Sequence, residues 1–141
     1  MEASELYDYA EKSGIEIISG LHKTKKAFCF ASGDVKGVSI DYRKIESAPE
    51  EKAVLFEEVG HIESDCLYYL SDYLNPCRRM LIAKAEAKAA DWAAAKQIPV
   101  AELKAALKKY TEIYELAEHF NVLEPVVIRA YNYWKRKDYK L

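Results

Sequence analysis

Residues 53–64 read AVLFEEVGHIES, and they decide how we expect the chain to fold. Their apolar side chains, continued by one cysteine, follow the i, i+4, i+7, i+11 spacing of a helix face: Leu55, Val59, Ile62 and Cys66. This spacing predicts a single amphipathic helix over about residues 48–65, with its apolar stripe turned toward the core. Ser47, Pro49 and Glu50 form a capping box with proline in the first turn, which is typical of a helix start.

The same helix carries side chains that can bind a metal ion. Glu57 and His61 are four residues apart, so they lie on one face, and Glu58 lies on the flank of that face near His61. Two ligand-type residues at this spacing, with a carboxylate directly after the first, have the geometry of the HExxH metallopeptidase helix. Here a glutamate stands in place of the first histidine.

A catalytic zinc site needs a third protein ligand and leaves the fourth position to water. We expect Glu86, on the next long helix, because an antiparallel helix can bring it opposite His61. Asp65 is the alternative, but residues on three successive turns of one helix are too collinear to surround a tetrahedral ion. Glu58 would be the general base that takes a proton from the metal-bound water, so that hydroxide attacks a peptide carbonyl.

A plainer interpretation of the pattern stays open. Glu57 and His61 on the exposed face of a charged helix can be ordinary solvated side chains in a non-catalytic binding protein. If they do bind an ion, a carboxylate in place of an imidazole moves the preference from zinc toward harder ions such as Mn²⁺.

Length and composition favour one soluble domain over residues 1–141. Of the 141 residues, 50% are hydrophobic and 31% are charged, and the net charge of −2 gives no basic field for nucleic acid. No apolar run is long enough to span a membrane, and the first residues, MEASE, do not resemble a signal peptide. The cysteines are odd in number and unpatterned: Cys29, Cys66 and Cys77. We therefore expect a cytoplasmic protein that contacts no membrane and does not bind nucleic acid directly.

The segments before the central helix predict a small sheet. A helix over about residues 2–13 is followed by strand-like segments at 15–19, 27–31 and 37–42, the last two joined by the turn Ser32-Gly33-Asp34. We expect a three-stranded antiparallel sheet packed on the central helix. His22 lies among lysines and is expected in a loop. Gly60, inside the central helix, suggests that a strand or substrate backbone comes close there.

The rest of the chain is expected to be helical. An alanine-rich helix runs from Asn75-Pro76 to Gln97, and further segments follow at about 100–109, 113–120 and 126–134. The last two have the outline of a helix-turn-helix, but the basic residues at their end are better explained as a solubilising tail: Lys135, Arg136, Lys137 and Lys140. The fold class is therefore α+β, with three parts: helix and sheet over 1–45, metal-site helices over 46–98, and a C-terminal helical bundle over 99–141.

The order of these motifs resembles the ImmA/IrrE family of small, gluzincin-like metallopeptidases. The resemblance rests on EKAVLFEEVGH at 51–61, on Glu86 six residues before Trp92-Ala93, on the stop at Ile98-Pro99 and on the closing helices at 113–129. It implies metal ligands at Glu57, His61 and Glu86 and a general base at Glu58. It also implies cleavage of a phage or mobile-element repressor as the function.

Two positions depart from the commoner family pattern. Glu57 replaces histidine, although the Glu-Glu form recurs in phage-borne members. Ala90 stands where members often carry an acidic or amide residue, and Asp91 is one step away. The alternative is an inactive member that binds a protein partner. Tyr68 and Tyr69 follow the central helix and are candidates to line the substrate cleft, with ordinary packing as the alternative.

Overall fold

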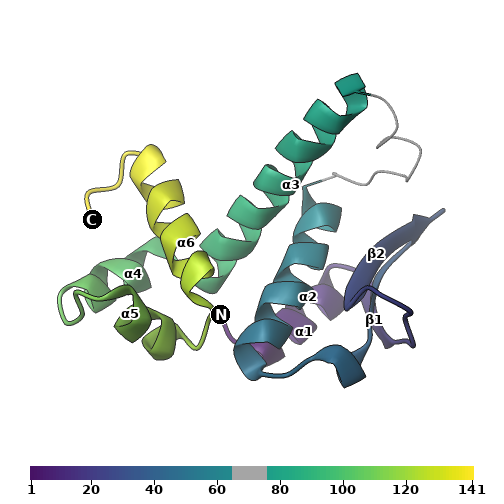
Figure 1. Cartoon of the computed structure of the whole chain (residues 1–141), viewed down its shortest axis with the longest axis horizontal. Helices are drawn as coiled ribbons and strands as arrows, with labels where there is room; N and C mark the ends of the chain where they lie inside the picture. The colour runs from purple at the N-terminus through teal and green to yellow at the C-terminus, as the bar shows by residue number, and fades with distance from the viewer. Residues whose placement is uncertain (65–75) are drawn as a thin grey trace.

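The computed structural model describes residues 1–64 and 76–141 of the chain. It is α+β, with a helix and three strands followed by helices (Figure 1). The elements are α1 (Ala3–Lys12), β1 (Ile15–Ser19), β2 (Ala27–Ser32), β3 (Val35–Ile40), the 3-10 helix η1 (Tyr42–Lys44), α2 (Ala48–Glu63), α3 (Pro76–Gln97), α4 (Val100–Leu107), α5 (Ile113–Phe120) and α6 (Glu124–Arg136). Their ends differ from the predicted ones by at most two residues.

The sheet is mixed, so the prediction of an antiparallel sheet is wrong in part. Its strand order is β1-β3-β2, and β2 pairs antiparallel with β3 as the hairpin predicts. However, β1 pairs parallel with β3, with Ile17 opposite Val38. Strand β3 lies between β1 and β2, which run in opposite directions. Its central place explains why Val38 and Ile40 are fully buried.

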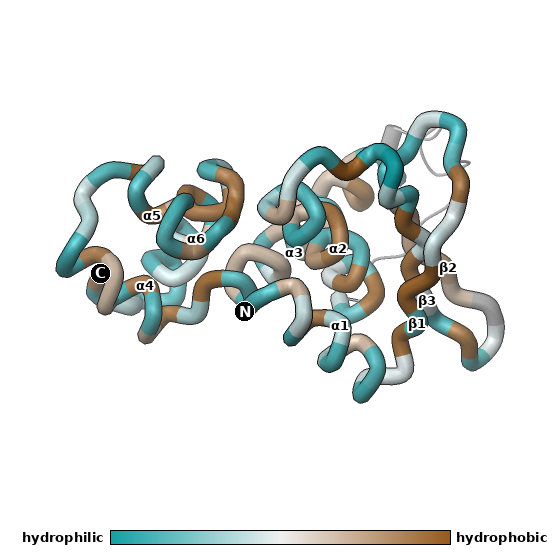
Figure 2. The backbone as a smooth tube through the Cα atoms, turned by 90° about the horizontal axis from the view of Figure 1, so that it is seen from below, coloured by the Kyte–Doolittle hydropathy of each residue, from teal (hydrophilic) through white to brown (hydrophobic). Residues whose placement is uncertain are grey.

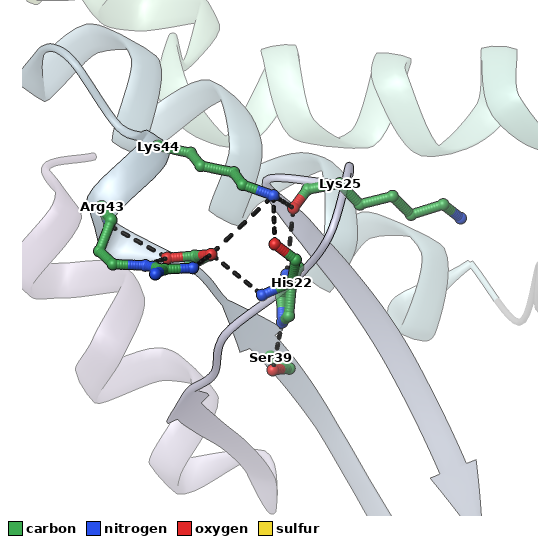
Figure 3. A network of polar contacts seen from close by, with 6 residues as sticks. His22, Lys25, Ser39, Arg43 and Lys44 are labelled. Atoms are coloured by element: carbon green, nitrogen blue, oxygen red, sulfur yellow. Dashed lines mark hydrogen bonds and ion pairs between the residues drawn. The ribbon is translucent and has the colours of Figure 1, made fainter.

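A polar network fixes the connection from β1 to β2 across the end of β3 (Figure 3). Asp41 is inaccessible to solvent, and its carboxylate accepts hydrogen bonds from the backbone N–H of His22 at 3.0 Å and from the guanidinium of Arg43 at 2.9 and 2.8 Å. The ring Nε2 of His22 lies 2.8 Å from the hydroxyl of Ser39. His22 is thus in a loop, as expected, but it holds that loop in place.

The buried residues form two groups (Figures 1 and 2). One group joins the sheet with α1 and α2, and the other joins α4, α5 and α6 with the end of α3. The N-terminus lies between them, where the ammonium of Met1 donates a hydrogen bond to the carbonyl of Gln97 at 3.0 Å. Within the described residues, no helix combines the length and apolar character that crossing a membrane requires.

Helices α2 and α3 approach each other closely at Gly60. A Cβ atom at this position would lie 2.7 Å from the carbonyl oxygen of Ala89 and 3.2 Å from Cε3 of Trp92. The expected close approach therefore exists, but the neighbour is α3 and not a strand or a substrate backbone. The small residue lets the two helices that carry the candidate ligands pack against each other.

Candidate metal centre

Burial of one face of α2 determines which side chains the helix presents to its neighbours. Leu55 and Val59 are fully buried and Ile62 is nearly so, which confirms the predicted apolar stripe for these three residues. The hydroxyl of Ser47 accepts a hydrogen bond from the backbone N–H of Glu50 at 3.2 Å, as the predicted cap requires. With its start and its buried face both set, α2 has little freedom to rotate.

Glu57, His61 and Glu86 converge from two helices. One ligand atom from each lies within 4.8 Å of the other two. The Nε2 atom of His61 is 3.2 Å from the Oε2 atom of Glu86, across the contact between α2 and α3. His61 is buried, Glu86 is partly buried and Glu57 is exposed. The structure thus brings together the three residues that the sequence singled out.

The alanine-rich sequence of α3 explains how Glu86 reaches His61. Glu86, Ala89 and Ala93 are spaced i, i+3, i+7, so they share one face of the helix. Ala89 and Ala93 are buried, and Ala89 is the residue whose carbonyl lies against Gly60. Because Ala89 and Ala93 are small, this face of α3 can lie close to α2, and the carboxylate of Glu86 reaches the imidazole of His61.

The charges of the group favour a bound cation. The pKa of the Glu57 carboxyl is raised, first by desolvation and then by the negative charge of Glu86. Two carboxylates so close together repel each other, and a divalent ion between them would remove that repulsion. Two carboxylates and one imidazole are suitable ligands for zinc or manganese. The residues present can therefore hold a metal ion.

Glu58 lies beside this group in a different environment. It is partly buried, and burial is the main cause that raises the pKa of its carboxyl. Its neighbour is Cys29 on β2, whose thiol pKa is raised to about 12, first by burial and then by the charge of Glu58 and a hydrogen bond with it. A carboxylate with a raised pKa is a stronger base at neutral pH than an exposed one.

Cys29 is a neighbour of the site that the sequence analysis missed. In the sequence it is only one of three unpatterned cysteines. Successive side chains of β2 point to opposite faces of the sheet, and this alternation could have located Cys29. Cys29 pairs with the fully buried Val38, and both side chains belong to the core side of the hairpin. The alternation places the thiol on the sheet face that packs on α2, although it does not name Glu58 as its partner.

Other residues considered from the sequence lie apart from the group or outside the described residues. Asp91 does not contribute to it, because its carboxylate binds Arg129 at 2.9 Å and Arg136 at 2.8 Å. Asp65, the alternative ligand, lies outside the described residues, as do Cys66 and the candidate cleft residues Tyr68 and Tyr69.

Comparisons with protein-family models, curated proteins and solved structures found no match for this chain. The resemblance to the ImmA/IrrE family therefore rests on the motifs and their spacing.

Proposed function

We propose that the chain is a metal-dependent endopeptidase. The observation that carries this proposal is the convergence of ligand atoms from Glu57, His61 and Glu86 within 4.8 Å, with Glu58 next to them. These three residues would hold zinc or another divalent ion such as manganese. When bound, the ion would act as a Lewis acid that polarises a carbonyl group and makes water acidic near neutral pH.

Glu58 would act as the general base and then as the general acid. Its carboxylate would take a proton from the attacking water, and the water oxygen would form a bond to the peptide carbon. When the C–N bond breaks, the leaving amine would take that proton from Glu58. The raised pKa of this carboxyl supports both steps, because the group must accept and return one proton at the same pH.

The sheet edge beside the site supports a polypeptide substrate. Within the described residues, β2 is an edge strand that pairs with β3 alone, and an edge strand can take up an extended peptide. Cys29 connects this strand to Glu58, which places a peptide added along β2 near the proposed base. The motif resemblance suggests a phage or mobile-element repressor as the substrate, and we place the reaction in the cytoplasm.

An alternative is a protein-binding regulator of the same fold without catalytic activity. The contact of 3.2 Å between Nε2 of His61 and Oε2 of Glu86 favours it, because these two groups satisfy each other without an ion. In that case the two helices would serve only as a scaffold for binding a partner.

Metal content separates the two functions. We expect one equivalent of divalent metal in protein purified without a metal-binding tag, measured by elemental analysis. Glu86→Gln and His61→Ala should lose the metal, whereas Glu58→Gln should keep it and lose cleavage of the repressor carried by the same genetic element. Folded wild-type protein that binds no added zinc or manganese would refute the enzyme proposal. Retained cleavage in Glu58→Gln would show that another group is the base.

A further inference from the structure

A groove with a basic lining lies between α3 and α6, next to the end of α2. Its volume is about 620 Å³, and Trp92 and Tyr133 form part of its wall. Four cationic side chains line it, two from α3, one from α6 and one directly after α6: Lys84, Lys88, Arg136 and Lys137. All four are exposed.

Among the described residues that line the groove, the one acidic side chain, Asp91, is already paired with cations. One carboxylate oxygen of Asp91 binds Arg129 at 2.9 Å, and the other binds Arg136 at 2.8 Å. One carboxylate thus faces two guanidinium groups as well as the lysines. The Arg136 side chain is 61% exposed, so its remaining N–H donors can reach a ligand. The described lining of the groove therefore carries a net positive charge, in a chain whose overall charge is negative.

The groove is separate from the candidate metal centre. Lys84 and Lys88 are four residues apart and lie on one side of α3. Glu86 is two residues from each of them, so it projects from nearly the opposite side of the helix, about 160° away around the axis. A ligand in the groove would therefore contact neither the carboxylate of Glu86 nor the imidazole that faces it.

We propose that this groove binds an acidic segment of a protein partner. Carboxylates of the segment would pair with the lysines of α3 on one side and with Arg136 and Lys137 on the other. Apolar side chains between those carboxylates would pack on Trp92 and Tyr133. Both walls are helical, so little ordering is needed on binding. The proposal goes beyond the proposed function, because this binding requires neither a metal ion nor cleavage.

The aromatic rings of the groove argue against a nucleic-acid strand as the occupant. Single-stranded nucleic acid is bound by stacking bases on open aromatic faces along a basic path. Here the Nζ atom of Lys137 lies 5.6 Å from the centre of the Tyr133 ring, and that of Lys96 lies 5.7 Å from the Trp92 ring. One face of each ring is thus covered by a cation. Lys137, which also lines the groove, favours a carboxylate there.

Fluorescence anisotropy with defined probes tests the proposal on the full chain. The probe is a labelled peptide of alternating glutamate and leucine, compared with the same peptide carrying glutamine for glutamate. We expect the acidic peptide to bind more tightly, and its binding to weaken with added salt. Lys84→Glu with Lys88→Glu should weaken it roughly tenfold. Lys108→Glu with Lys109→Glu, which changes the net charge equally on exposed residues outside the groove, should leave it nearly unchanged.

Three results would overturn the proposal. One is equal binding of the acidic and glutamine peptides, and another is equal binding of the acidic peptide by the groove variant and the control. The third is a groove variant that binds the acidic peptide normally but has lost another interaction. That interaction would be either binding of single-stranded DNA or formation of a dimer that sedimentation detects for the wild type. If the variant with both Lys84→Glu and Lys88→Glu does not fold, as judged by circular dichroism, a milder pair of variants provides the same comparison. In that pair Lys88→Gln is the groove variant and Lys108→Gln is its control.

Discussion

The ammonium of Lys52 donates a hydrogen bond of 2.9 Å to the backbone carbonyl of Phe120. The Lys52 side chain is 1% exposed, and the carboxylate of Glu2 lies 3.6 Å from its nitrogen. Lys52 belongs to α2, which packs in the first group of buried residues, whereas Phe120 ends α5 in the second. A cation at a helix C-terminus is favoured by the helix dipole. This bond therefore links the candidate metal helix to the C-terminal helices.

Removing the Lys52 ammonium should destabilise the fold. We expect Lys52→Met, which keeps most of the volume, to lower the free energy of unfolding by about 1–2 kcal/mol, because the Phe120 carbonyl loses a charged donor. Lys52→Ala should cost about 2–4 kcal/mol, since a cavity is added. Urea denaturation measures both values. Lys108→Met, at an exposed position, is the control and should change little, and a Lys52→Ala variant as stable as this control would contradict the prediction.

Gly60→Ala should weaken the contact between α2 and α3. Alanine is the better helix former by about 1 kcal/mol. However, its methyl group would meet the Ala89 carbonyl at 2.7 Å, and that backbone atom cannot move without shifting α3. We expect a net loss of about 1–3 kcal/mol in denaturation experiments and weaker zinc binding in calorimetry, because Glu86 moves with α3. An unchanged or increased stability would show that the helices can separate at no cost.

The Cys29 thiol should react slowly. Its pKa is raised from 9.0 to about 12, so the folded protein holds it protonated through the range in which the unfolded chain would ionise. The stabilisation by the protonated thiol is complete below pH 9.0 and is lost as the pH rises toward 12. At pH 8 we expect its alkylation by iodoacetamide to be roughly a hundredfold or more slower than that of an unperturbed thiol.

The rate is measured at Cys29 by peptide mass spectrometry, with the urea-unfolded chain as the reference. Glu58→Gln should raise it, because one of the causes of the shift is the negative charge of Glu58. Equal rates in the folded and unfolded chain would contradict the placement of this thiol against α2.

The Asp41 network should make the fold sensitive to acid. The side-chain hydrogen bonds from Arg43, followed by the backbone N–H of His22, hold the pKa of the Asp41 carboxyl well below its ordinary value of 3.8. Its stabilisation is therefore complete above pH 3.8 and is lost as the pH falls below that value through the lower pKa of the folded state.

Asp41→Asn tests this pH dependence. We expect the variant to be less stable than wild type at pH 7 by urea denaturation, and the difference to shrink below pH 3.8. Asp8→Asn, on the exposed face of α1, is the matched control and should show no such convergence. A constant difference across the acid range would mean that the charge of Asp41 contributes nothing.

The sheet shows where local sequence patterns stop being informative. Alternation and the turn at Gly33, whose φ is +61°, identify the hairpin of β2 and β3. They contain no information on which edge of that hairpin receives β1. That choice depends on the path of residues 20–26 across the end of β3, and on the burial of Asp41, which fixes this path. The error in the predicted sheet therefore lies in the parallel pairing of β1 with β3, whereas the three strands were identified correctly.

The candidate site also combines features that follow from local sequence with features that depend on tertiary packing. The positions of Glu57, Glu58 and His61 on one helix follow from spacing alone. The choice of Glu86 rested on its place on the next long helix and on the motif resemblance, and the structure finds it 3.2 Å from His61. Metal binding itself stays a prediction. Cys29 beside Glu58 and the carbonyl of Phe120 above Lys52 were not anticipated, because each pair joins segments with no shared local pattern.

What the sequence determined by itself was local: where helices begin and end, which face of α2 is apolar, and which acidic and imidazole groups share the other side. Capping, turn conformation and side-chain periodicity depend on residues a few positions apart, so they can be worked out along the chain. Only the tertiary structure decided the central place of β3, the meeting of two carboxylates with His61 and the basic groove between α3 and α6. These depend on how distant segments pack, and packing is selected by the burial of the whole chain rather than by any one stretch of it.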